Sequence, residues 1–168
     1  IITFSRILLI PLFIFVVKTN PLLGALVFFL ASATDLLDGY IARKSKQVTK
    51  LGVLLDPLAD KLLVISALIV FVDMEVIPAW IAIVIITREF VVTGLRIVAL
   101  SKDIIIPAEM GGKVKTITQF VSIFMLLTDR LHINLDLYAS GVALLWISML
   151  IGIASGIQYF ISFWRRLS

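Results

Sequence analysis

Apolar residues along the chain gather into six runs, separated by short polar stretches. A helix needs about 20 mainly apolar residues to cross the hydrocarbon core of a bilayer, and most of the runs approach this length. We expect helices at roughly 3–17, 22–42, 56–71, 79–100, 113–127 and 137–163. Proline before the second and fourth runs supports these boundaries. The pattern predicts an all-α integral membrane protein with six transmembrane helices, forming a single domain over residues 1–168.

The composition agrees with a membrane protein. Of the 168 residues, 61% are hydrophobic and 15% are charged, whereas a soluble domain is about half apolar and a quarter charged. The chain contains no cysteine, which excludes disulfides, thiolate metal sites and cysteine nucleophiles. The candidate chemistry therefore depends on carboxylates and cations.

Lysine and arginine are distributed unevenly over the two sides that six spans define. One side carries Lys18 and Arg130 alone. The other side carries most of the remaining basic residues, among them Arg6, the 43–50 segment, Lys102, Lys113, Lys115, Arg165 and Arg166. Basic residues concentrate on the cytoplasmic side of a membrane, so we expect both termini to be cytoplasmic. The net charge of +4 then reflects topology and attraction to anionic lipid, and a nucleic-acid partner is not needed to explain it.

Four aspartates lie at the predicted cytoplasmic ends of the second and third helices: Asp35, Asp38, Asp56 and Asp60. Helical residues three or four apart share a face, so each pair projects from one side of its helix. We expect the eleven or so residues between the helices to let them pack antiparallel, with the two pairs facing each other. Clustered carboxylates repel unless cations compensate them, and oxygen ligands suit Mg²⁺ or Mn²⁺. The alternative is that these aspartates are helix caps and surface charges.

The residues around the aspartates carry a family resemblance. The pattern Asp35-x-x-Asp38-Gly39-x-x-Ala42-Arg43, then eight residues, then Gly52-x-x-x-Asp56-x-x-x-Asp60 resembles the signature of the CDP-alcohol phosphotransferases. Every fixed position is present at the family's spacing. The segments LDPLADKLLV, TREFVVTGLR and GGKVKT are similar to those of the bacterial phosphatidylglycerophosphate synthases, a branch of that family.

The resemblance implies a reaction and a role for each residue. Such enzymes transfer a phosphatidyl group from CDP-diacylglycerol to an alcohol, here glycerol 3-phosphate, and release CMP. Asp35, Asp38, Asp56 and Asp60 would hold two divalent ions, Mg²⁺ or Mn²⁺, and Asp60 would also be the catalytic base. The residues implied for the CDP moiety are Gly39, Ala42, Arg43, Thr49 and Gly52. The resemblance further implies a homodimer in the cytoplasmic membrane of a bacterium, with its active site facing the cytoplasm.

The phosphate of glycerol 3-phosphate needs cations near the aspartates. Arg88 and Arg96 are eight residues apart and lie on similar faces of the fourth predicted helix, and Lys113 and Lys115 begin the fifth. We expect these four residues to bind the acceptor phosphate. The alternative for Arg88 is a structural ion pair with neighbouring Glu89 or with an aspartate.

Two other functions are compatible with parts of the pattern. The same chemistry could use another acceptor, such as inositol phosphate or serine. A cation or proton transporter also places carboxylates in a membrane, but it predicts acids near mid-membrane and inverted repeats. Here the acids cluster at one membrane face and no repeat is visible, which favours the enzyme.

Overall fold

The protein is described by a computed structural model, which covers the backbone of residues 2–45, 50–102, 110–129 and 136–167. Side chains are described for residues 8–33, 61–102, 110–129 and 136–166. Within these ranges the chain forms six α-helices and no strand. They are α1 (Ile2–Thr19), α2 (Pro21–Ser45), α3 (Lys50–Asp73), α4 (Ala79–Ser101), α5 (Met110–Asp129) and α6 (Leu137–Leu167). Each predicted helix is present, so the all-α prediction is confirmed over this part of the chain.

The connection between α2 and α3 is shorter than the sequence pattern suggested. α2 continues to Ser45 and α3 already begins at Lys50, so only residues 46–49 separate the two helices. The expected linker of about eleven residues is therefore wrong. α2 runs three residues past its predicted end at 42, because Arg43 and Lys44 are good helix formers. α3 begins six residues before its predicted start at 56, through Lys50 and the mainly apolar residues that follow it. Hydropathy marks where the chain becomes polar, while the helix ends depend on the backbone.

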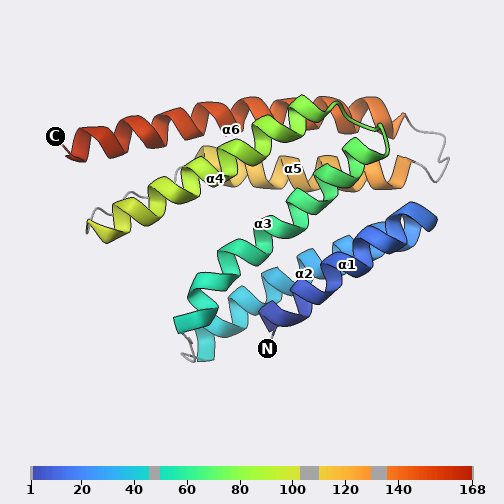
Figure 1. The fold of residues 1–168 in the computed structure, drawn as a ribbon, viewed down its shortest axis with the longest axis horizontal. Helices are drawn as coiled ribbons and strands as arrows, with labels where there is room; N and C mark the ends of the chain where they lie inside the picture. The colour runs from blue at the N-terminus through green and yellow to red at the C-terminus, as the bar shows by residue number, and fades with distance from the viewer. Residues whose placement is uncertain (1, 46–49, 103–109, 130–135, 168) are drawn as a thin grey trace.

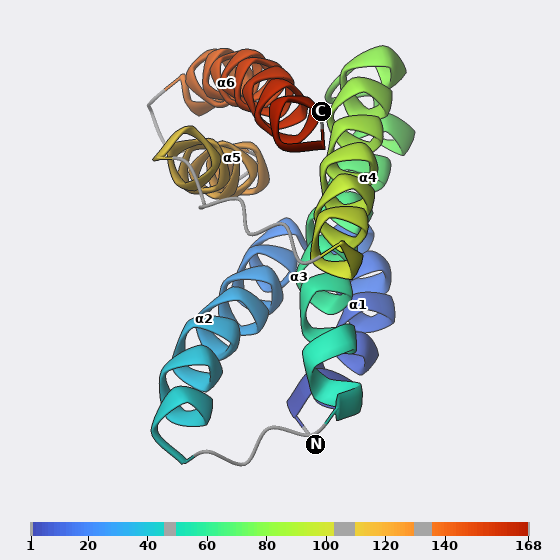
Figure 2. The same cartoon turned by 90° about the vertical axis from the view of Figure 1, so that its left-hand side faces the viewer.

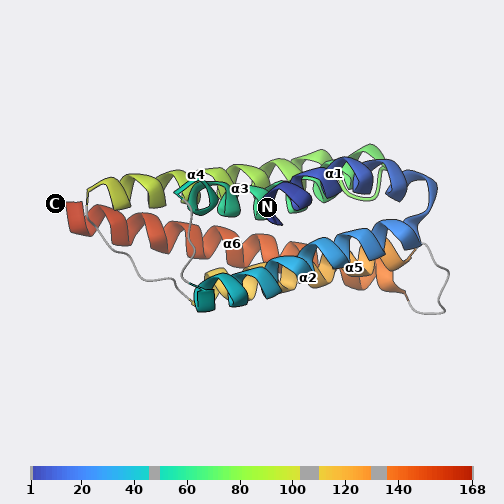
Figure 3. The same cartoon turned by 90° about the horizontal axis from the view of Figure 1, so that it is seen from below.

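The six helices form two layers of three, which Figure 3 shows from the edge. One layer contains α1, α3 and α4, and the other contains α2, α5 and α6, as the end view in Figure 2 also shows. Successive helices alternate in direction, so that α1, α3 and α5 begin, and α2, α4 and α6 end, toward the left of Figure 1. The two ends of the described chain therefore lie on the same side of the molecule.

Aromatic side chains join the two layers in the first half of the molecule. Phe28 of α2 lies between Phe13 of α1 and Phe120 of α5, with ring centroids 5.8 and 5.7 Å apart. Phe13 and Phe28 are almost fully buried. Their large apolar area makes such rings effective core residues, and here they hold α1 and α2 against the second half of the chain.

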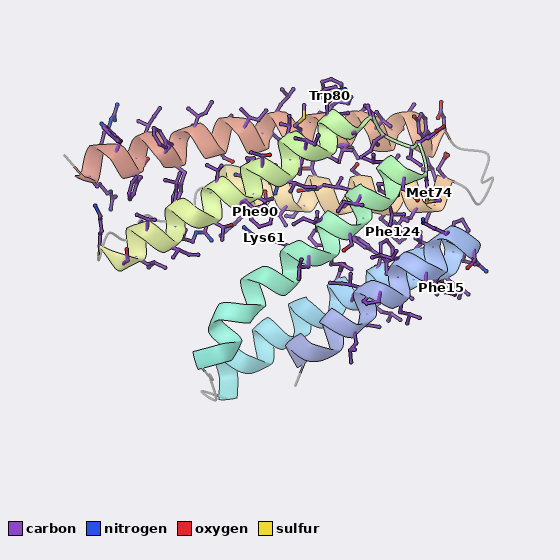
Figure 4. The ribbon with its side chains drawn as sticks, in the orientation of Figure 1. Phe15, Lys61, Met74, Trp80, Phe90 and Phe124 are labelled. Atoms are coloured by element: carbon purple, nitrogen blue, oxygen red, sulfur yellow. The ribbon has the colours of Figure 1, made fainter. Side chains whose placement is uncertain are left out.

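The outer surface carries many large hydrophobic side chains. Large hydrophobic side chains remain exposed on all the helices, for example Phe15 of α1 (74% exposed) and Trp80 of α4 (46%), which point away from the helices in Figure 4. A soluble protein rarely exposes apolar patches of this extent. Within the described ranges, one helix, over Leu137–Arg166, is long and apolar enough to cross a membrane by length and composition.

A tight turn sets the angle between α3 and α4. The Val76 amide donates to the Phe71 carbonyl (2.8 Å) and the Glu75 amide to the Val72 carbonyl (3.1 Å). This is the hydrogen-bond pattern of a Schellman motif, and Glu75 adopts its left-handed conformation with φ 57°. α4 then begins immediately after Pro78. The short turn keeps the α4 residues that carry charge close to α3.

Candidate active site

The charged side chains of the described core converge on Glu89 of α4. Its carboxylate forms ion pairs with Arg88 (2.8 Å), with Lys61 (3.6 Å) and with Lys115. The Glu89 and Lys115 side chains are only 13% and 6% exposed. Burial of so many charges is costly unless they pair and hydrogen-bond. A single carboxylate therefore stabilises cations from three different helices.

Lys61 connects α3 to α4 (Figure 4). Its ammonium donates to the backbone carbonyl of Glu89 (3.3 Å) and to the hydroxyl of Thr93. Thr93 in turn donates to the Glu89 carbonyl (2.6 Å). Lys61 directly follows Asp60, the predicted catalytic base. The sequence left its role open, and the structure shows that it anchors this part of α3 to α4.

Arg88 connects α4 to α6. Its Nε donates to the Gly152 carbonyl and its Nη2 to the Ser155 hydroxyl, both at 2.7 Å. Gly152 and Gly156 of α6 lie against the guanidinium, since a Cβ added at either position would be in ordinary van der Waals contact with Arg88 Nε, at 3.6 and 3.5 Å. Small residues of this kind allow helices to approach closely in membrane proteins. The ion pair between Arg88 and Glu89, which the sequence analysis kept as the alternative for Arg88, is observed.

A cavity of about 550 Å³ lies beside this cluster. Such a volume is typical of a small-molecule site. Residues of α3, α4, α5 and α6 line it, and all four predicted phosphate ligands are among them: Arg88, Arg96, Lys113 and Lys115. The structure thus brings together cations that the sequence placed on two separate helices. Glu89 is the one acid among the lining residues whose side chains the structure describes.

The four cations differ in their partners. Arg88 and Lys115 pair with Glu89, whereas no ion pair links Arg96 or Lys113 to an acid within the described residues. Arg96 lies over the ring of Tyr159, with its Cζ 5.9 Å from the ring centroid. Both of these cations are exposed. The positive charge available to an incoming anion is therefore greatest at Arg96 and Lys113.

The predicted metal and nucleotide residues lie on α2 and α3 or between them. Asp35, Asp38, Gly39, Ala42 and Arg43 are part of α2, and Gly52, Asp56 and Asp60 are part of α3. Their side chains lie outside the described residues, and Thr49 lies outside them altogether. Among the side chains that are described, no group of three or more potential metal-binding His, Cys, Asp or Glu residues occurs. The roles assigned to these residues remain predictions.

Sequence reasoning missed two cavity residues. Glu89 was considered only as a partner for its neighbour Arg88, although it also binds Lys61 and Lys115. Gln119, a buried polar residue in the apolar part of α5, was not considered. Its spacing of four residues from Lys115 was the available signal, since such residues share a helix face.

Comparison with known proteins identifies the class. Residues 1–154 match the family model of the CDP-alcohol phosphatidyltransferases, and the chain belongs to this family. It is 41% identical to the CDP-diacylglycerol–glycerol-3-phosphate 3-phosphatidyltransferase of Bacillus subtilis, over 99% of this chain and 94% of the relative. It is 37% identical to the Haemophilus influenzae protein of the same name, over 94% of this chain and 88% of the relative. A probable phosphatidylglycerophosphate synthase of Mycobacterium tuberculosis is 31% identical, over 95% and 78% of the two chains.

Proposed function

We propose that this protein transfers the phosphatidyl group of CDP-diacylglycerol to sn-glycerol 3-phosphate, giving phosphatidylglycerophosphate and CMP. The observation that carries the proposal is the cation-lined cavity beside Lys61, the residue that follows Asp60 in α3. It offers a site for an anionic acceptor next to the helix that carries the predicted base. The printed names of the relatives agree with this reaction.

We further propose that all six helices cross the cytoplasmic membrane of a bacterium, with both termini and the active site on the cytoplasmic side. The alternating helix directions (Figure 1) and the exposed apolar surface support this arrangement. So does the bias of Lys and Arg toward one side. The nucleotide part of CDP-diacylglycerol then reaches the site from water, and the acyl chains of the same molecule remain in the bilayer beside the helices.

The chemistry of the acidic residues fits a divalent metal. Asp35, Asp38, Asp56 and Asp60 offer only oxygen ligands, which Mg²⁺ and Mn²⁺ prefer. Two such ions, when bound, neutralise negative charge on the phosphate oxygens of the substrate. The carboxylates come from two neighbouring helices, α2 and α3, which contact each other. Holding these ions is the role we propose for the four aspartates.

The remaining residues would bind the substrates and move the proton. Asp60 accepts the proton of the acceptor hydroxyl, whose oxygen forms a new bond to the phosphatidyl phosphorus as the bond to CMP breaks. Arg43 binds a phosphate of the CDP moiety through its guanidinium. The small residues Gly39, Ala42 and Gly52 leave space for the nucleotide. The hydroxyl of Thr49 contacts it.

The pairing of the cations refines the proposed acceptor site. Arg96 and Lys113, which have no acidic partner in the described part of the chain, bind the phosphate directly. Arg88 and Lys115, which pair with Glu89, add positive potential to the site. They also bind the phosphate when it interacts with them together with the Glu89 carboxylate. A homodimer also remains part of the proposal, on the family resemblance.

The decisive experiment offers purified protein CDP-diacylglycerol with one acceptor at a time, with Mg²⁺, Mn²⁺ or a chelator, and measures CMP release. We expect turnover with glycerol 3-phosphate that is lost in the chelator and in Asp60→Asn. Turnover that is faster with serine or another phosphate-free acceptor contradicts the proposed substrate. Ion flux without CMP release instead supports a transporter.

The phosphate site has its own test in Arg96→Ala. Loss of a charge-assisted hydrogen bond costs roughly 1.5–3 kcal/mol, so we expect the KM for glycerol 3-phosphate to rise at least tenfold. Lys102→Ala is the matched control, because Lys102 follows the end of α4 and does not line the cavity. An equal effect of the two substitutions rules out the assignment of Arg96.

A further inference from the structure

One residue that lines the cavity carries a side-chain nitrogen without a hydrogen-bond partner. Gln119 of α5 lines the cavity and is 2% exposed. Its amide nitrogen Nε2 is buried and is the one side-chain polar atom, among those described, that is buried without a hydrogen-bond partner. A buried donor without a partner is rare and destabilising. This nitrogen therefore suits a ligand that brings an acceptor atom into the cavity.

The position of Gln119 indicates which ligand this is. Gln119 follows Lys115 by four residues on α5, so the two residues share the face that lines the cavity. The neighbouring turns carry Lys113 and Lys115, which we assign to the acceptor phosphate. By contrast, the residues assigned to the nucleotide lie at the end of α2, at the start of α3, or between these two helices in the sequence. The amide therefore belongs with the acceptor.

The chemistry of the group points the same way. A side-chain amide nitrogen offers two N–H donors and accepts none, while the oxygens of a glycerol phosphate can all accept a hydrogen bond. The walls near Gln119 include apolar residues, such as Leu68 and Ile85, which cannot compete for the donors. The four residues that we assign to the phosphate are positively charged, whereas Gln119 contributes a neutral hydrogen-bond donor.

We propose that Gln119 is a specificity-determining residue of the acceptor site, which donates from Nε2 to an oxygen of the bound glycerol phosphate. This inference rests on the proposed function and deepens it. An acceptor that places no oxygen at this point leaves the buried amide unsatisfied, and such a loss discriminates strongly between substrates. Gln119 thus selects the acceptor, while the cations supply general attraction for its charge.

The test compares Gln119→Met with the wild-type protein. Methionine has a similar length but donates no hydrogen bond. We expect the KM for glycerol 3-phosphate to rise about tenfold, as for the loss of one hydrogen bond, and the KM for CDP-diacylglycerol to stay within twofold. The thermal midpoint in detergent should remain equal or rise, because the substitution removes an unsatisfied buried group. Gln119→Glu, which replaces the donors by acceptor oxygens, should raise the same KM further.

Ser122→Ala is the matched structural control. Ser122 lies one turn further along α5, is fully buried, and donates to the Gly141 carbonyl of α6 at 2.7 Å. Its loss should lower the thermal midpoint and leave the acceptor KM unchanged. If Gln119→Met behaves like Ser122→Ala, with a lower midpoint and an unchanged KM, Gln119 is structural and the inference is overturned.

A binding readout separates this inference from the proposed function. Glycerol 3-phosphate alone should raise the thermal midpoint of the wild-type protein, and the rise should be smaller for Gln119→Met. Wild-type protein that gains neither protection nor turnover from glycerol 3-phosphate overturns the proposed function and the inference built on it. Full protection of both proteins overturns the role of Gln119 alone.

Discussion

Glu89 faces three cations, Lys61, Arg88 and Lys115, and no other acid lines the described walls of the cavity. These walls carry five basic residues and one carboxylate, so positive charge remains in excess even after Glu89 is counted. An anionic acceptor would offset this excess. At the scale of the residue, Glu89 is the described carboxylate that holds three of these cations in place.

Glu89→Gln should destabilise the protein. The substitution removes the charge that compensates three largely buried cations, and an uncompensated buried charge costs about 3 kcal/mol. For a chain of this size we expect the thermal midpoint to fall by about 6–12 °C, measured in detergent without substrate. Glycerol 3-phosphate should restore part of the loss, because its phosphate replaces the missing carboxylate.

An exposed ion pair provides the control for Glu89→Gln. Lys18 pairs with Asp73, and their side chains are 50% and 57% exposed. Exposed pairs contribute at most about 1 kcal/mol, so Asp73→Asn should change the midpoint by less than about 4 °C. Equal effects of the two substitutions would mean that burial does not govern the Glu89 cluster.

At the scale of the element, the first two helices meet at a very tight corner. Asn20 alone separates them, and its side-chain oxygen accepts from the amides of Leu22 and Leu23 at 3.1 and 3.2 Å. This is an N-cap followed by proline at the first helical position, a combination that favours helix initiation. The corner brings Gly24 of α2 against Val17 of α1.

Gly24→Ala should therefore disrupt the pairing of α1 and α2. A Cβ at Gly24 would lie 2.7 Å from the Cα of Val17, a backbone atom that cannot move away alone. Overpacking of this kind costs typically 1–3 kcal/mol. We expect a lower thermal midpoint and a lower yield of folded protein, measured by size-exclusion chromatography in detergent.

Gly94→Ala is the matched substitution for this experiment. Gly94 is also helical but is exposed, whereas Gly24 is buried, and no atom lies within 4 Å of a Cβ added at Gly94. Alanine has the higher helix propensity, by about 1 kcal/mol, so Gly94→Ala should be neutral or stabilising. Destabilisation of both variants would point to a general intolerance of alanine rather than to the α1–α2 contact.

At the scale of the whole molecule, the alternating helix directions predict on which side of the membrane each helix end lies. The start of α6 and the end of α4 lie at opposite ends of the molecule (Figure 1). Ser140 and Ser101 mark these two ends, and both are exposed. The chain contains no cysteine, so a single introduced thiol reports on its own position.

Ser140→Cys in intact cells should react with a maleimide that cannot cross membranes, and Ser101→Cys should react only after permeabilisation. The reason is that basic residues keep the end of α4 on the cytoplasmic side. Mass spectrometry or gel shift detects the label, and the unsubstituted protein serves as the blank. The reverse labelling pattern would invert the proposed topology and place the active site outside the cell.

Much of the architecture was predictable because its causes are local. Apolar runs and proline positions predicted all six described helices. The length of the α2–α3 connection was not predicted, since both helices extend past the ends that hydropathy indicated. The eight-residue spacing of Arg88 and Arg96 indicated two cations on similar faces of one helix, and Lys113 and Lys115 were expected at the start of the next. That both pairs line one cavity could only be a hypothesis, because spacing relates residues within a helix and not between helices.

The sequence by itself determined the helical class, the membrane-like composition and the family, because each depends on residue types at fixed separations along the chain. Only the tertiary structure decided how the charges pair. Distances between α3, α4, α5 and α6 determine that Glu89 binds Arg88, Lys61 and Lys115, that Arg96 and Lys113 have no acid among the described partners, and that the Gln119 amide is left unsatisfied. Ion pairs and hydrogen bonds act over a few ångströms, and the packing of the helices sets those distances.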